Sequence, residues 1–158
     1  MGRLTYLDNS DLAPEFQDIP RMKSNITRAV AHSPKLARNV AGRGMYFRHD
    51  STLDVRLREL AILQVGYSAR SAYEWAHHVD IALSFGVSAD DIRAIALDTQ
   101  GIATHLDPVA SAVLAAARSL TDAIVLPQAI FDVLAGAMDT TQLVDLLVAI
   151  ANTTAWCA

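Results

Sequence analysis

The chain has 158 residues, of which 52% are hydrophobic and 19% charged, and its formal net charge is −4 at pH 7. This length is typical of one compact domain with its own hydrophobic core. The acidic balance, without any run of five like charges, argues against nucleic acid or an anionic membrane as a partner.

The single cysteine, Cys157, excludes an intrachain disulfide, a cysteine-based metal site and a CxxC redox pair. The first residues, MGRLTYLDNSDLAPEF, lack the apolar core of a signal peptide. No apolar run approaches the ~20 residues that a membrane span needs. We therefore expect a cytoplasmic protein with no membrane partner.

The composition predicts helices, because aromatic residues make up 6% and the chain has 7 glycines and 5 prolines. Residues 1–22 include two prolines and read as an irregular arm. A helical hairpin follows, formed by residues 24–31 and 34–47, with Pro34 in the first turn of its second helix. We expect an N-terminal arm over residues 1–22 and one helical domain over residues 23–158.

The remaining helices are bounded by residues that favour helix starts and stops. Asp54, Ser71 and Ser88 are candidate N-caps, and Ser88 opens a pattern that resembles a capping box with Asp91. A loop is expected over residues 98–105. The expected helices cover residues 54–69, 71–85, 88–97, 107–123, 127–138 and 140–158. The predicted fold class is therefore all-α, a single-domain helical bundle of about seven or eight helices without a convincing strand.

Residues 56–86, RLRELAILQVGYSARSAYEWAHHVDIALSFG, hold a carboxylate inside an apolar run. No charged residue lies between Leu60 and Ala69, so Glu59 is the acid on a segment that otherwise reads as a buried helix. Burying a carboxylate is costly unless a partner compensates its charge. We predict that this partner is His78.

Ser71, Glu74 and His78 share one face of the following helix, because positions i, i+3 and i+7 lie together. A carboxylate and an imidazole stabilise each other's charged forms, whereas burial opposes charge, and this balance can leave a proton mobile for general acid–base catalysis. A metal site is not expected. His77 and His78 diverge by about 100° on a helix of ~3.6 residues per turn, so they cannot both join Glu74 around one ion.

Each of these residues also has a purely structural interpretation. Glu59 could be satisfied by Arg56 or Arg70, and Ser71 is foremost a helix cap. Trp75 suits the core at least as well as the wall of a ligand site. The functional interpretation therefore depends on whether the fold brings Glu59 and His78 together.

The segment LRELAILQVGYSARSAYEWAHHVDIALSFGVS resembles the carboxymuconolactone decarboxylase family, which also contains the alkylhydroperoxidase D-type proteins. That family shows a Glu, then two residues three apart, then a His four further on, and Glu59, Ser71, Glu74 and His78 occupy those positions. The segments ITRAVAHSPKLARN and QLVDLLVAIANTTAW resemble the family more weakly. Peroxidase members carry a CxxC pair at the two middle positions, so the resemblance is to the sub-type that lacks it.

The resemblance implies an alkylhydroperoxidase D-like fold and a lyase that uses neither a metal nor an organic cofactor. His78, held by Glu59, would deliver a proton to the carbanion left when CO2 departs from a small carboxylated lactone or cyclic acid. Glu74 would relay that proton or hydrogen-bond the oxyanion, and Ser71 would orient the substrate. The candidate substrate-binding residues are Arg28, Arg56, Arg70, Tyr67 and Trp75.

The resemblance also implies a homotrimer or a hexamer, and the apolar last helix independently favours a homo-oligomer. A second class of function stays open, namely a non-catalytic ligand-binding or assembly protein on the same scaffold. Contact between Glu59 and His78 in a cavity favours the enzyme, whereas a filled core favours the alternative. A peroxidase is the least supported, because the CxxC pair is absent.

Overall fold

The structure is a computed structural model that describes residues 4–19 and 24–157. Over these residues the fold is all-α, as predicted, and no strand is present. Two short 3-10 helices, Asn9–Asp11 and Pro14–Phe16, precede the α-helices. The α-helices are α1 (Asn25–Val30), α2 (Pro34–His49), α3 (Val55–Ser68), α4 (Ala72–Ser84), α5 (Ala89–Thr99), α6 (Pro108–Ala123), α7 (Gln128–Ala137) and α8 (Thr140–Cys157).

The helices begin at the capping residues that the sequence indicates. The side chain of Asp54 accepts a hydrogen bond from the Leu57 amide at the start of α3, and Ser71 does the same for the Glu74 amide at the start of α4. Each cap satisfies an amide that the first turn of a helix leaves unpaired. These two caps fix where α3 and α4 begin, and therefore where Glu59 and His78 lie along them.

The chain forms two compact units, residues 1–51 and residues 52–158. The first unit contains α1 and α2 and has a small core, made of Leu12, Ile19, Ala31 and Ala37. The described part of the arm predicted for residues 1–22 thus belongs to the same unit as the helical hairpin that follows it. The domain boundaries proposed from the sequence stay a prediction.

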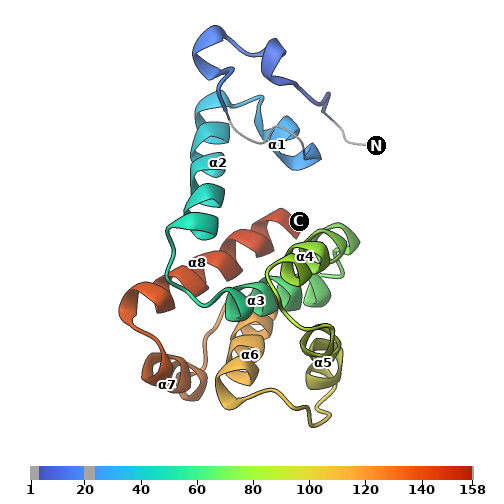
Figure 1. The fold of residues 1–158 in the computed structure, drawn as a ribbon, viewed down its shortest axis with the longest axis vertical. Coiled ribbons are helices and arrows are strands. Elements are labelled where there is room, and N and C mark those ends of the chain that lie inside the picture. The colour runs from blue at the N-terminus through green and yellow to red at the C-terminus, as the bar shows by residue number, and fades with distance from the viewer. Residues whose placement is uncertain (1–3, 20–23, 158) are drawn as a thin grey trace. The chain divides into compact units, whose positions relative to one another are not determined.

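Helix α3 is the centre of the second unit. It packs against α4, α5, α6 and α8, and Figure 1 shows it surrounded by these helices. Every residue from Arg58 to Gly66 is buried. One face of α3 contributes Ala61 and Val65 to a core with α6, α7 and α8, and another contributes Leu60 and Leu63 to a core with α4, α5 and α6.

The turn between α3 and α4 brings the two helices close together. The amide of Arg70 donates to the carbonyl of Tyr67 and that of Ser71 donates to the carbonyl of Gly66, the two bonds of a Schellman motif. Arg70 has a φ of 54°, a left-handed conformation that glycine normally provides at this position. For a residue with a side chain this conformation costs about 1–2 kcal/mol.

Candidate functional site

Glu59 and His78 are in direct contact. The Nδ1–H of His78 donates to Oε2 of Glu59 over 2.9 Å. Glu59 is 2% exposed, whereas 18% of the His78 side chain is exposed. The pair predicted from the sequence is therefore present, with the carboxylate inside and the imidazole at the edge of the protein.

Arg58 neutralises the other oxygen of the same carboxylate. Its Nε donates to Oε1 of Glu59 over 3.0 Å, and Arg58 is itself 4% exposed. The Phe85 ring covers the guanidinium, with 5.6 Å between the ring centroid and the central carbon. The interpretation that Arg56 or Arg70 would satisfy Glu59 is wrong, because Arg58 takes that place. Since an arginine stays cationic in proteins, Glu59 faces a permanent positive charge.

Glu74 lies on the other side of the imidazole. Its Oε2 is 3.7 Å from Nε2 of His78, and the residue is 6% exposed. Burial raises the pKa of the Glu74 carboxyl above its ordinary value, while the nearby His78 acts in the opposite direction. His78 therefore lies between two buried carboxyl groups, one compensated by an arginine and one inclined to keep its proton.

Ser71 caps α4 and also contacts the end of the chain. The Glu74 amide donates to its Oγ over 3.4 Å. The Cys157 thiol at the end of α8 is hydrogen-bonded to the same side chain, and Figure 1 shows this end of α8 beside α4. Burial raises the pKa of the Cys157 thiol, and the hydrogen bond to Ser71 opposes that shift. The thiol is thus favoured over the thiolate that nucleophilic or redox chemistry requires.

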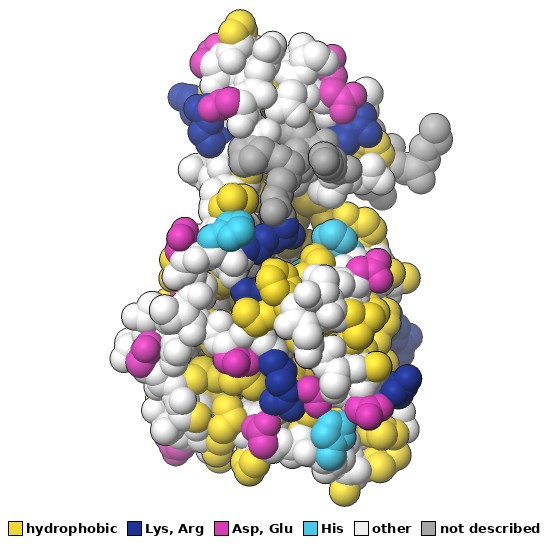
Figure 2. Space-filling view, viewed as in Figure 1, with side chains coloured by type: hydrophobic (Ala, Val, Ile, Leu, Met, Phe, Trp, Pro, Cys, Tyr) yellow, Lys and Arg dark blue, Asp and Glu magenta, His cyan; other side chains and the backbone are white. Residues whose placement is uncertain are grey.

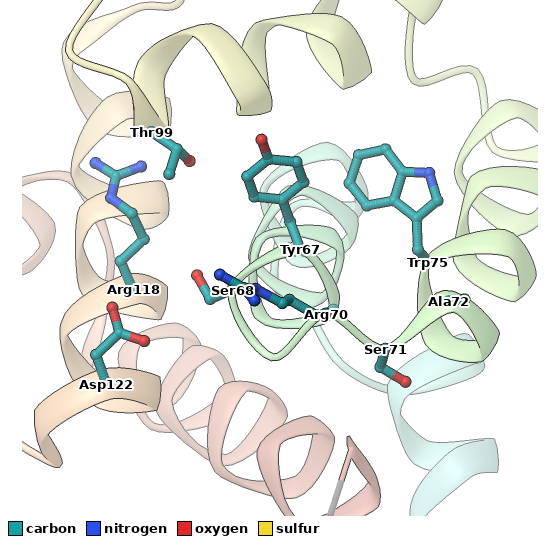
Figure 3. A pocket seen from close by; sticks show the side chains of 10 residues that line it. Tyr67, Ser68, Arg70, Ser71, Ala72, Trp75, Thr99, Arg118 and Asp122 are labelled. Atoms are coloured by element: carbon teal, nitrogen blue, oxygen red, sulfur yellow. The ribbon is translucent and has the colours of Figure 1, made fainter.

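An open pocket of about 820 Å³ lies beside this turn, between α3, α4, α5 and α6. Figure 3 shows Tyr67 and Trp75 next to each other on one side and Thr99 and Arg118 on the other. The rings of Tyr67 and Trp75 are 5.8 Å apart between centroids. The pocket is lined by Gly66, Tyr67, Ser68, Arg70, Ser71, Ala72, Trp75, Thr99, Arg118 and Asp122. Glu59, Glu74 and His78 are not among the lining residues.

Of the candidate substrate-binding residues, Tyr67, Arg70 and Trp75 line the pocket. Arg56 and Arg28 do not. Arg56 bonds Asp91 over 2.6 Å and Asp107 over 2.9 Å, which ties α3 to α5 and to the start of α6. Arg28 belongs to the first unit, where it pairs with Asp8 over 3.1 Å.

His77, the neighbour of the central histidine, points along a different direction. Its ring stacks on Tyr73 with 5.9 Å between centroids and 17° between planes. Burial lowers the pKa of His77, and the adjacent His78 lowers it further. No group of three metal-ligating side chains that could hold an ion occurs over residues 4–19 and 24–157.

The sequence model of the carboxymuconolactone decarboxylase family matches residues 34–119, more than half of the chain. The chain belongs to that family. The match includes Glu59, Ser71, Glu74 and His78, together with α3, α4 and α5. No curated protein matches the chain.

In this carboxymuconolactone decarboxylase family member, a polar cluster beside the pocket was not predicted from the sequence. Gln64, Thr99, Arg118 and Asp98 are joined by hydrogen bonds, although they come from α3, α5 and α6. Two signals in the sequence point to them. Gln64 interrupts the apolar run of α3, and Arg118 interrupts the Ala-rich run of α6. Neither signal identifies the partner, because the partners are up to 54 residues apart.

Proposed function

We propose that this protein is a lyase, or a related proton-transfer enzyme, that acts on a small carboxylated lactone or cyclic acid. Membership of the carboxymuconolactone decarboxylase family supports a function of this kind at the level of the family. The observation that carries the proposal is the placement of His78 between Glu59 and Glu74, at 2.9 and 3.7 Å. Proton transfer to carbon needs a positioned acid of this type.

The reaction breaks the bond between a ring carbon and its carboxylate. CO2 leaves, and the electron pair stays on the carbon, delocalised as a dienolate onto the lactone carbonyl. The proton comes from Nε2 of His78, because Nδ1 is occupied by Glu59. Glu59, which Arg58 holds through its other oxygen, fixes the direction of the imidazole ring so that Nε2 can give up its proton. In our proposal none of these steps uses a metal or an organic cofactor.

Glu74 has a separate role in the proposed reaction. A carboxyl group with a raised pKa can stay protonated in a dry site and donate a hydrogen bond to a developing oxyanion. The same group could return a proton to His78 after the reaction, since 3.7 Å separates Oε2 from Nε2. We propose that Ser71 orients the substrate, and that Tyr67, Arg70 and Trp75 contact it where they line the pocket.

The test is CO2 release from γ-carboxymuconolactone by the purified protein and by His78→Ala. The variant should remain folded, because Arg58 still compensates Glu59. We expect a loss of about 10²–10⁴-fold, the usual contribution of a general acid or base. His77→Ala is the matched control and should retain most of the rate, because His77 stacks on Tyr73. Equal loss in both variants would contradict the role given to His78.

One observation favours a second candidate, a ligand-binding protein without catalysis. The pocket is lined by ten residues, and neither Glu59 nor His78 is one of them. In such a protein Glu59, Glu74 and His78 would serve stability alone. Absence of turnover by the wild type, together with retained binding of a small acid, would favour this candidate over the lyase.

Thiol peroxidase chemistry has the least support. The positions of the family's cysteine pair hold Ser71 and Glu74, and the raised pKa of Cys157 disfavours its thiolate. Any peroxide turnover by the protein should therefore be unchanged in Cys157→Ser.

We also propose a cytoplasmic homo-oligomer, a trimer or a hexamer. Val144 is 52% exposed and Val148 is 42% exposed one turn apart on α8, an apolar surface that a second copy would cover. On the face shown in Figure 2, Lys and Arg side chains are interspersed with Asp and Glu rather than gathered into a basic patch. No helix over residues 4–19 and 24–157 is long and apolar enough to cross a membrane. Light scattering during gel filtration measures the subunit number directly.

A further inference from the structure

We propose that Arg118 is the carboxylate anchor of the pocket and that Gln64 and Asp98 hold it in position. The ligand class is a small acid with a planar, unsaturated or aromatic body. This inference rests on the proposed function for the identity of the natural substrate. The role of Arg118 concerns ligand binding, however, so a binding measurement tests it even if the protein shows no catalysis.

The first support is the way in which Arg118 is held. Its Nη1 donates to Oδ1 of Asp98 over 2.7 Å and to Oε1 of Gln64 over 3.1 Å. Gln64 is fully buried, and its own amide donates to Ser68 over 3.1 Å. The Thr99 hydroxyl lies 3.1 Å from the same Gln64 oxygen. A partly buried network of this kind, centred on the buried Gln64, fixes the direction of the guanidinium.

The second support is the part of the guanidinium that the network leaves open. Within residues 4–19 and 24–157, all hydrogen bonds of Arg118 are made by Nη1. Its Nε–H and Nη2–H groups form a parallel pair of donors, the geometry that a carboxylate accepts with both oxygens. Arg118 lines the pocket, and 24% of its side chain is exposed there. The network thus fixes the Nη1 side of the guanidinium, and the Nε and Nη2 side remains available to bind a ligand.

Arg70 is a second, independent indication. It lines the same pocket and makes no ion pair with any residue that the structure describes. It also occupies a left-handed position, with φ of 54°, at which a glycine would fit without strain. A strained residue kept at a cavity points to a role for its side chain. The charges of the two arginines are balanced by Asp122, which also lines the pocket, and by Asp98, which pairs with Arg118, so the free donors, and not net charge, favour a carboxylate ligand.

The aromatic wall determines the body of the ligand. Tyr67 and Trp75 stand side by side in Figure 3, with 56° between their planes, and Tyr67 lies between Trp75 and Arg118 in that view. Flat rings and conjugated chains pack well against such surfaces, because aromatic faces and edges attract each other. A carboxylate on Arg118 therefore leaves the rest of a flat acid against Tyr67 and Trp75.

The experiment is calorimetric titration with benzoate and with benzamide, which has nearly the same shape but no charge. We expect the wild type to bind benzoate at least about tenfold more tightly, the effect of one charge-assisted hydrogen bond. Arg118→Lys keeps a cation beside Asp98 but loses the parallel donors, so it should weaken benzoate by about tenfold and leave benzamide unchanged. Arg93→Gln is the control. Arg93 pairs with Asp90 on the surface, so this variant should bind benzoate as tightly as the wild type does.

A second pair of variants separates strain from binding. Arg70 and Ile124 are the two residues other than glycine with positive φ in the described part of the chain. Arg70→Gly and Ile124→Gly should both raise the melting temperature, but only Arg70→Gly should weaken benzoate. Equal binding of benzoate and benzamide by the wild type, or unchanged benzoate binding in Arg118→Lys, would overturn the proposal. His78→Ala should bind benzoate normally, so a failure of catalysis is distinguishable from a failure of the anchor.

Discussion

At the scale of single residues, Glu74 is the group whose charge the fold opposes most clearly. It is 6% exposed, and burial raises its pKa, with His78 acting against that shift. A carboxyl whose pKa is raised by folding stabilises the protein fully below the pKa of the unfolded chain. That contribution is lost as the pH rises through the higher pKa of the folded protein. Once the pH exceeds the pKa of Glu74 in the folded protein, its buried charge therefore lowers the free energy of unfolding.

The variant Glu74→Gln removes this effect, because its amide keeps the size of the carboxyl but cannot ionise. We expect the two proteins to have similar free energies of unfolding near about pH 4, with the variant increasingly more stable toward about pH 8. Denaturant titrations at both pH values measure the difference. Asp80→Asn, at an exposed acid of the same helix, is the control. A variant that is less stable than the wild type at the higher pH would contradict the expectation.

The central pair was predictable from the sequence for a physical reason. A carboxylate inside an apolar helix needs a partner, and the fixed register of the next helix leaves few candidates, of which His78 is one. Arg58 was not predicted, because on an ideal helix it points about 100° away from Glu59, and only the long flexible side chain closes that gap. The pocket residue Arg118 was missed because its partners come from two other helices.

At the scale of elements, the close approach of α3 and α4 depends on Gly66. A Cβ atom at this position would lie 3.3 Å from the backbone nitrogen of Trp75 and 3.5 Å from Cβ of Glu74. A backbone atom cannot move aside as the end of a flexible side chain can. Gly66 thus sets the distance between the helix that holds Glu59 and the helix that holds His78.

We expect Gly66→Ala to lower the free energy of unfolding by about 1 kcal/mol, because overpacking outweighs the better helix propensity of alanine. Gly136→Ala is the matched control near the end of α7, where a Cβ would meet nothing within 4 Å. That variant should gain about 0.5–1 kcal/mol. Thermal unfolding of both variants measures these changes. A more stable Gly66→Ala variant would contradict the expectation, because it would show that α3 and α4 can move apart without loss of stability.

The helix boundaries were largely predictable, because capping is a local effect between residues three apart. Ser88 shows the limit of predicting contacts from residues that are close in the sequence. Its side chain accepts from the Asp91 amide as expected, but the Asp91 carboxylate bonds Arg56 and His105 instead of completing a capping box. Arg56 lies 35 residues from Asp91, and the hydrogen bonds with it lower the pKa of Asp91. Partners so distant are chosen by the packing of α3 on α5.

At the scale of the whole molecule, the two units differ in how much core they possess. Residues 52–158 contain two clusters of buried apolar side chains, whereas the core described for residues 1–51 has four members. Helical periodicity predicts which residues of a helix are buried, but not which helices pack together. The sequence therefore predicted the helices well, and the grouping of the first two helices with the arm came from the structure.

We expect residues 52–158, produced alone, to be helical and to unfold in one cooperative transition, because both larger cores lie within them. Residues 1–51 alone should lose most of their helical signal, since so short a chain buries too little surface. Circular dichroism with heating tests both fragments beside the full chain. A fragment 52–158 without a cooperative transition would contradict this expectation.

The burial of α3 has a consequence for how the protein opens. Nine successive residues, Arg58–Gly66, are shielded, and helices surround them. Their backbone amides should exchange with deuterated solvent only when the second unit opens as a whole, while amides of the more exposed α7 exchange through local openings. Hydrogen-exchange mass spectrometry would then find the slowest protons of the molecule around Glu59, so the last part of this unit to meet water would be the carboxylate that holds His78.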